Sequence, residues 1–139
     1  MSEKNSIKPL LASLLLEAKN LSHNFDYELF KNINLSLAKK ESIAIIGTSG
    51  SGKSTLLNIL SSLLKPTNGN VVFQSKDLYS LKQNELLKIR RDDFGIVFQA
   101  HYLFRGFSAL ENLNIATLLS HQDIDYKLLD VIKFLSLKS

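Results

Sequence analysis

The chain is 139 residues long, with 45% hydrophobic residues, 22% charged residues and a mean hydropathy near zero. This composition excludes a disordered tail, a collagen-like chain and a low-complexity polymer, and a chain of this length can bury one hydrophobic core. With 17 Lys and Arg against 13 Asp and Glu, the formal net charge is +4, which is a mild excess of basic residues.

The distribution of basic residues and the absence of cysteine narrow the function further. The basic pairs Lys39-Lys40 and Arg90-Arg91 stand apart and are diluted by acidic residues, whereas nucleic-acid-binding proteins more often gather basic residues on one stripe. We therefore expect no nucleic-acid partner. Without cysteine there is no disulfide framework and no thiolate nucleophile, and three scattered histidines make a poor zinc site.

The N-terminal part of the chain is predicted to form strands after a mobile tail at residues 1–9. The apolar run Leu10–Leu16 is far too short to span a membrane, so any membrane association would need a partner. Strands are expected at Leu14–Leu21 and Ile33–Leu37, and the polar stretch His23–Lys31 is expected to connect them as a hairpin.

A buried strand and an amphipathic helix are predicted on either side of a glycine-rich turn. The nearly continuous apolar run Ser42–Ile46 is typical of a strand covered by helices on both faces. The turn Gly47–Gly52 follows, and Lys65–Gly69 then ends the helix. Spacings of three and four residues predict one apolar helix face, made of Leu56, Leu57, Leu60, Leu63 and Leu64.

The next segments alternate between the two kinds of element. A strand is expected at Val71–Phe73 and a short helix at Asn84–Arg91. Phe94–Phe98 is an apolar run like the one before the glycine-rich turn, and it predicts a second buried strand. The order of strands and helices indicates an α/β fold.

Two helices are predicted in the C-terminal part. Ser108 and Glu111 have the spacing of a capping box, in which each side chain satisfies a free backbone amide at a helix start. The first helix is therefore expected from Ser108 to about Leu119. A second helix is expected at Ile124–Leu137, where apolar residues recur on one face.

The most informative segment is Gly-Thr-Ser-Gly-Ser-Gly-Lys-Ser-Thr at residues 47–55, which matches the P-loop pattern. Phosphate oxygens need several donors that converge in a small concavity, and glycines let backbone amides converge without obstruction by side chains. The helix that begins near Lys53 adds free amides and the positive end of its dipole. The residues predicted to bind nucleotide phosphates are Gly47, Thr48, Ser49, Gly50, Ser51, Gly52, Lys53, Ser54 and Thr55.

Individual side chains of this loop have predicted roles. Lys53 is expected to reach the outer phosphates as a point charge, and the Ser54 hydroxyl is expected to complete the shell of a magnesium ion. Thr55 can add a further donor. ATP and Mg²⁺ are therefore the expected ligands, although a P-loop alone does not separate transporter ATPases from GTPases and small-molecule kinases.

The segments around the P-loop resemble the ATP-binding subunits of ABC transporters, most closely the bacterial lipoprotein-releasing and macrolide-exporter type. The similarity rests on the runs 35–59, 64–69, 94–99 and 108–112, and it covers the chain from about Leu16 onward. It implies a P-loop NTPase (RecA-like) core with a small N-terminal antiparallel β portion, with residues 10–139 as the N-terminal part of the ATP-binding domain. The family usually has glycine at the position of Lys40, so we expect modest backbone strain there.

The resemblance also implies residue roles and partners. Phe25 matches the aromatic position that stacks on adenine, with His23 near the adenine edge and without a chemical role. Gln99 matches the glutamine that contacts magnesium and the attacking water. The loop His101–Phe107 would receive the membrane permease, and a second ATP-binding subunit would complete a homodimer. The implied location is cytoplasmic, peripheral on the inner face of the cell membrane.

Other family motifs have no match in these residues: the Leu-Ser-Gly-Gly-Gln signature, the strand that ends in a magnesium-binding aspartate with its glutamate, and the switch histidine. Neither Asp92-Asp93 nor Asp123 and Asp125 follows an apolar strand. We therefore expect the fold to be incomplete at the C-terminus and ATP hydrolysis by this chain alone to stay at background. The alternatives are a truncated nucleotide-binding fragment that does not hydrolyse, or another P-loop NTPase or kinase.

Overall fold

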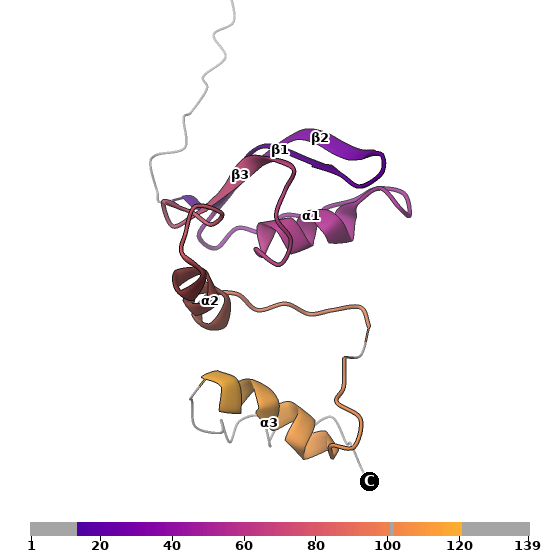
Figure 1. Ribbon diagram of the computed structural model, residues 1–139, viewed down its shortest axis with the longest axis vertical. Coiled ribbons are helices and arrows are strands. Elements are labelled where there is room, and N and C mark those ends of the chain that lie inside the picture. Colours follow the sequence, from indigo (N-terminus) through magenta and orange to yellow (C-terminus); the bar gives the residue numbers. More distant parts are fainter. Residues whose placement is uncertain (1–13, 101, 121–139) are drawn as a thin grey trace, which may run out of the picture. The chain divides into compact units, whose positions relative to one another are not determined.

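The computed structural model describes residues 14–100 and 102–120, which divide into two compact units. The first unit extends to Phe94 and contains four strands and two helices (Figure 1). Its strands form one antiparallel sheet with the order β2-β1-β3-β4. The second unit begins at Gly95 and contains one described helix.

The longest strands, β1 (Leu14–Asn24) and β2 (Glu28–Ala38), form a hairpin. The predicted strands are confirmed, but both are longer than expected, and the prediction of a connection over residues 23–31 is wrong. Only residues 25–27 form the turn, and the Phe25 amide donates a hydrogen bond to the Tyr27 carbonyl at 3.0 Å. Strand pairing satisfies backbone groups, so polar side chains in this stretch do not prevent it.

The other strands of the sheet are β3 (Asn68–Phe73) and the two-residue β4 (Lys76–Asp77). The sequence predicted only the last three residues of β3, and it did not predict β4. β3 approaches β1 so closely at Gly69 that a Cβ there would lie 2.4 Å from the Lys19 carbonyl oxygen. Gly69 also has a φ of +85°, so only glycine fits this position.

Helix α1 (Lys53–Leu60) runs along one face of the sheet (Figure 1) and buries its apolar side chains there. Ile59 is fully buried in the same cluster as Leu21 of β1 and Val71 of β3. Burying an aliphatic side chain of this size stabilises the fold by about 1.5–3 kcal/mol. This contact fixes α1, and with it the loop that precedes α1, against the sheet.

The predicted apolar face of α1 is only partly correct. Leu56 and Leu60 are buried, and Leu64 packs partly against the core, but Leu57 and Leu63 are 55% and 47% exposed. The helix ends at Leu60, and the chain then adopts a left-handed conformation at Ser62, with a φ of 64°. The later leucines therefore do not continue the helical face that their spacing predicted.

The C-terminal end of α1 is closed by side chains from farther along the chain. The Tyr79 hydroxyl lies 2.6 Å from the Ile59 carbonyl oxygen and 2.5 Å from that of Leu64. Arg90 donates from Nε to the Ser62 hydroxyl at 2.8 Å and from Nη2 to the Ser62 carbonyl. Helix ends leave carbonyls without helical partners, so these contacts stabilise the helix and place a cation at the negative end of its dipole.

Two strand predictions are wrong in the structure. The segments 42–46 and 94–98 pair with no strand among the described residues. A β-strand requires a neighbour to accept and donate its backbone hydrogen bonds, and the sheet β2-β1-β3-β4 provides none for either segment. Apolar side chains of both segments are consequently exposed, Ile46 by 90% and Val97 by 100%.

The remaining helices agree with the sequence. Helix α2 (Gln83–Asp92) lies close to the predicted bounds. Helix α3 (Ala109–Ser120) follows the predicted capping box: the Glu111 carboxylate accepts hydrogen bonds from the Ser108 amide and hydroxyl, each at 2.7 Å. These bonds hold the pKa of Glu111 below its usual range. The expected strain at Lys40 is also confirmed by its φ of 68°.

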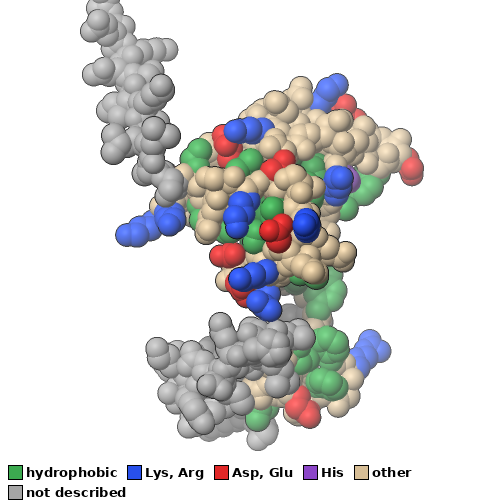
Figure 2. Space-filling view, turned by 60° about the vertical axis from the view of Figure 1, so that its left-hand side comes forward, with side chains coloured by type: hydrophobic (Ala, Val, Ile, Leu, Met, Phe, Trp, Pro, Cys, Tyr) green, Lys and Arg blue, Asp and Glu red, His purple; other side chains and the backbone are tan. Residues whose placement is uncertain are grey.

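The predicted tail at residues 1–9 and the helix at Ile124–Leu137 lie outside the described residues. Among the helices that the structure describes, none combines the length and the apolar character needed to cross a membrane. On the face shown in Figure 2, Lys and Arg side chains are interspersed with Asp and Glu side chains.

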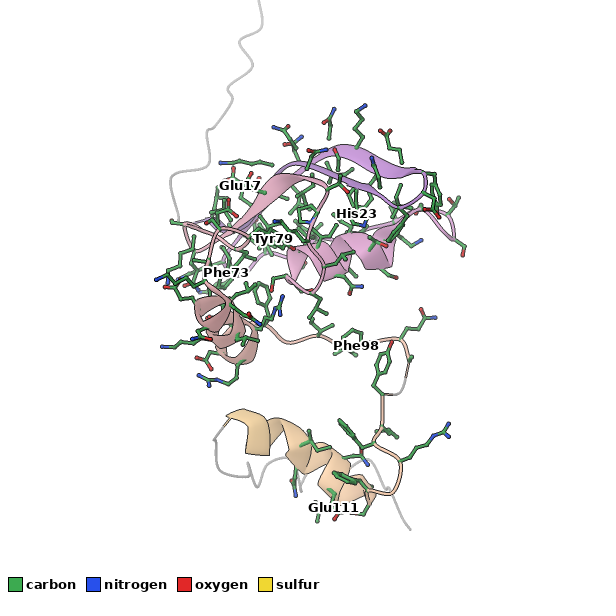
Figure 3. The ribbon with its side chains drawn as sticks, viewed as in Figure 1. Glu17, His23, Phe73, Tyr79, Phe98 and Glu111 are labelled. Atoms are coloured by element: carbon green, nitrogen blue, oxygen red, sulfur yellow. The ribbon has the colours of Figure 1, made fainter. Side chains whose placement is uncertain are left out.

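Replacing Tyr79 by phenylalanine removes the hydroxyl at the end of α1 (Figure 3) and should lower the free energy of unfolding by about 1–2 kcal/mol. Burial raises the pKa of Tyr79 above its usual value, so the folded chain keeps this proton at a pH where the unfolded chain loses it. The contribution of Tyr79 is therefore complete below pH about 10 and declines as the pH rises further.

Urea denaturation of the wild type, Tyr79→Phe and the control Tyr27→Phe at pH 8 and at higher pH measures both effects. Tyr27 is 63% exposed, so its variant should match the wild type. Equal stability of all three proteins would contradict the assigned role of the Tyr79 hydroxyl.

Candidate phosphate-binding site

The loop at residues 47–52 connects the extended segment 42–46 to α1 in a compact turn. Gly50 and Gly52 both have left-handed backbone conformations, with φ values of +80° and +87°. The Ser51 amide donates to the Thr48 carbonyl at 3.3 Å. Residues with a Cβ rarely adopt this conformation, so the two glycines explain why this sequence can turn here.

Gly52 is the N-cap of α1 and contacts the β-hairpin. A Cβ at Gly52 would lie 2.9 Å from Leu29 Cδ2 and 3.1 Å from Phe30 Cδ1, closer than side chains normally approach. The loop is thus seated against β2 through two apolar side chains. No pattern in the sequence marks Leu29 and Phe30 as residues of the site, because their contribution depends on how the hairpin packs on the loop.

The start of α1 is left open for an anion. Its N-cap makes no side-chain hydrogen bond, and its first turn contains no acidic residue. The first amides of a helix have no partner within the helix, and the helix dipole favours negative charge at this end. A basic residue, Lys53, stands there instead, so the local charge attracts an anion such as a phosphate.

Lys53 folds back over the loop. Its Nζ donates to the Gly47 carbonyl at 3.0 Å and to the Thr48 carbonyl at 2.7 Å. A lysine ammonium has three donors and strong charge, and among the described residues it makes no ion pair. Lys53 is therefore joined to the loop by hydrogen bonds between its ammonium and the backbone of the turn.

The side chains after Lys53 fit the predicted metal site. Ser54 is exposed and Thr55 is half-buried, both in the first turn of α1. Magnesium prefers hard oxygen ligands and is commonly held by one or two protein groups together with substrate phosphates. The described residues contain no group of three or more His, Cys, Asp or Glu side chains able to hold a metal ion. The role of Ser54 as a magnesium ligand stays a prediction.

Phe25 lies at the tip of the β1-β2 turn and is 56% exposed, so it is not a core residue. Its ring contacts the ring of His23 at a centroid distance of 4.8 Å and an angle of 86°. His23 is labelled in Figure 3 and is only 6% exposed. The adenine contact of Phe25 and the place of His23 near the adenine edge both stay predictions.

Gln99 and the aromatic loop belong to the second unit. In this unit Phe98 contacts Tyr102 edge to face at 5.1 Å, and Phe104 stacks on Phe107 at 5.8 Å. All four rings are about half exposed or more, and His101 lies outside the described residues. The role predicted for Gln99 stays a prediction.

The part of the aromatic loop (residues 101–107) between Phe104 and Phe107 is held by Asn112, a role that no sequence pattern indicated. Its Oδ1 accepts from the Phe104 amide at 2.8 Å, and its Nδ2 donates to the Phe107 carbonyl at 3.2 Å. The sequence signal was limited to an asparagine just after the capping box. These bonds fix the loop backbone while its aromatic side chains stay exposed.

The substitutions Gly52→Ala and Gly50→Ala separate backbone strain from crowding. Both glycines have positive φ, so alanine at either position should cost about 1–2 kcal/mol of stability. Only Gly52→Ala adds a clash with Leu29, because nothing lies within 4 Å of a Cβ at Gly50. Overpacking typically costs a further 1–3 kcal/mol or so. Chemical denaturation should rank Gly52→Ala as clearly less stable, and equal losses would contradict the described seating of the loop.

Comparison with known proteins agrees with this geometry. Residues 30–139 match the family described as ABC transporter. The lipoprotein-releasing system ATP-binding protein LolD of Wigglesworthia glossinidia brevipalpis is 38% identical over 127 residues, which cover 84% of this chain and 56% of that protein. The macrolide export ATP-binding/permease protein MacB of Shewanella sp. strain ANA-3 is 41% identical over 95 residues, covering 68% of this chain and 14% of that protein.

Solved structures show the same fold. The dimeric structure of MJ0796, a bacterial ABC transporter cassette, aligns with a TM-score of 0.77 at 33% identity and covers 89% of this chain and 58% of that chain. A post-hydrolysis state of MJ0796 bound to ADP and Pi aligns with a TM-score of 0.75. This chain spans about half the length of the LolD relatives it matches. The predicted resemblance is confirmed: the chain belongs to the ABC transporter family and has the fold of its ATP-binding cassettes.

Proposed function

We propose that this chain binds Mg–ATP through residues 47–55 as part of an ABC transporter ATPase. The observation that carries the proposal is the open start of α1, where Lys53 stands above a glycine turn and no acidic residue occupies the first turn. The cassette of MJ0796 bound to ADP and Pi supports this proposal, because it is a relative with a phosphate-containing ligand.

Binding would use the loop as it is already folded. The amides at the start of α1 would donate to phosphate oxygens, while the Lys53 ammonium would exchange its carbonyl acceptors for the outer phosphates. Carbonyl oxygens are neutral acceptors and phosphate oxygens are charged, so this exchange favours the phosphate. The turn is already closed by the left-handed Gly50 and Gly52 and by the Lys53 hydrogen bonds, and a preorganised loop lowers the entropic cost of binding.

The other ligand contacts are proposed from single residues. Ser54 would hold Mg²⁺, which when bound neutralises phosphate charge. For Gln99, in the second unit, a magnesium contact is proposed from the family resemblance alone. Phe25 would stack on adenine, and an exposed aromatic ring at a turn tip fits this role. Base stacking contributes about 1–3 kcal/mol without strong selection among bases.

We also propose the partners of the parent protein. LolD belongs to a lipoprotein-releasing system, and MacB is a combined ATP-binding/permease protein. Coupling of ATP binding and hydrolysis to a membrane permease is therefore proposed here, with lipoprotein release as the process that it drives. The exposed rings of the loop 101–107 are the proposed permease contact. A second ATP-binding subunit is the other proposed partner, at the cytoplasmic side of the inner membrane.

The second candidate function is nucleotide binding without ATP hydrolysis by this chain on its own. The segment 42–46, which pairs with no described strand, favours this candidate. This segment leads directly into Gly47, and Ile46 is 90% exposed. A segment that pairs with no described strand holds the loop less firmly than a strand within a sheet would. This candidate shares the phosphate site with the first and differs only in turnover.

Lys53→Ala should weaken Mg–ATP binding by about 100-fold, because a charged donor to phosphate is worth about 1.5–3 kcal/mol and desolvation adds to the loss. Isothermal titration calorimetry of the 139-residue chain measures this effect. Lys65→Ala is the matched control, since it removes the same charge from an exposed site and should stay within about twofold of wild type. Equal affinities of the Lys53→Ala variant and the wild type would refute the proposed phosphate site.

The same chain should show no Lys53-dependent ATP turnover. A phosphate-release assay should give equal rates for the wild type, Lys53→Ala and buffer, because no carboxylate among residues 14–100 and 102–120 follows an apolar strand as a metal ligand should. Turnover that disappears in Lys53→Ala would instead support the first candidate for the chain on its own.

A further inference from the structure

His23 is a buried aromatic residue that the phosphate site does not use. It is 6% exposed, and neither of its ring nitrogens has a hydrogen-bond partner among the described residues. Burying a polar ring without hydrogen bonds is unfavourable, so other contacts of the ring must offset this cost. Its contacts are aromatic: the Phe25 ring at 4.8 Å and 86°, and the Phe30 ring at 6.3 Å and 35°.

These contacts continue to the phosphate loop. Phe30 lies opposite His23 in the β1-β2 hairpin, and Phe30 Cδ1 is 3.1 Å from the position of a Cβ on Gly52. Contiguous packing thus leads from the exposed Phe25 through the buried His23 and the half-buried Phe30 to the N-cap of α1. All of these residues belong to one compact unit.

We infer that His23 is a positioning residue that fixes the Phe25 ring relative to the phosphate loop, so that one nucleotide can place its base on Phe25 and its phosphates at Lys53. An exposed phenylalanine at a turn has several accessible rotamers, and ordering it on binding costs entropy. A perpendicular ring against Phe25 restricts these rotamers before the nucleotide arrives. This inference rests on the proposed function.

The ring of His23, rather than its nitrogens, carries this role, because neither nitrogen is hydrogen-bonded to a described residue. Phenylalanine at position 23 should therefore preserve the aromatic contact, whereas alanine should remove it. His23 is near the end of β1, and Phe25 is the first residue of the turn that follows, two positions further along the chain. The sequence alone contains this spacing but not the burial of His23.

Calorimetry with two ligands tests the inference. Mg–ATP has a base and inorganic Mg–tripolyphosphate has none, so only Mg–ATP should respond to the position of Phe25. We expect His23→Ala to weaken Mg–ATP binding by about five- to tenfold, the range of a lost aromatic pair, and to leave tripolyphosphate binding within about twofold. His23→Phe should bind both ligands within about twofold of wild type.

A double-mutant cycle completes the test. If His23 acts through Phe25, the double variant His23→Ala/Phe25→Ala should bind Mg–ATP no more weakly than Phe25→Ala alone. Additive losses, a loss of tripolyphosphate binding in His23→Ala, or failure of His23→Phe to restore Mg–ATP affinity would each overturn the positioning role. If the wild type binds tripolyphosphate and His23→Ala has no effect, only this inference fails. If the wild type binds neither ligand, the proposed function fails and the inference fails with it.

Discussion

The structure depends on one constraint: the backbone must reverse between an extended segment and a helix so that amides at the start of α1 stay free. The left-handed conformations of Gly50 and Gly52 make this turn possible, and the missing Cβ of Gly52 lets Leu29 and Phe30 pack against it. The Lys53 ammonium closes the turn through hydrogen bonds to two carbonyls of the loop. The conformation, the packing and the charge of this turn therefore all depend on Gly50, Gly52 and Lys53.

The two ends of α1 show how this constraint becomes a binding site. At the C-terminal end, Tyr79 and Arg90 donate hydrogen bonds to backbone carbonyls, and these contacts anchor the helix to later parts of the chain. At the N-terminal end, no side chain caps the helix and no acid balances its dipole. One end therefore holds the helix in place, while the other keeps its donors available for a ligand. Buried Ile59 links both ends to the sheet.

Local sequence signals predicted the elements that depend on local interactions. The capping box at Ser108 and Glu111, the start of α1 and the glycine turn all follow from hydrogen bonds or dihedral angles within a few residues. The predictions of strands at 42–46 and 94–98 were wrong, because strand pairing depends on neighbouring strands that the described residues do not supply. The contacts of His23 were not predictable either, since they require the register of the hairpin and its packing against α1.

The central claim is that residues 47–55 form the phosphate-binding site of this chain. Titration of the isotopically labelled chain with Mg–ATP, followed by backbone amide NMR, tests it most directly because each loop amide reports separately. The account predicts that the largest shifts fall on residues 47–55, with a second group at the turn around Phe25. Saturating Mg–ATP that leaves the amides of residues 47–55 unshifted, or that shifts only residues elsewhere, would contradict it.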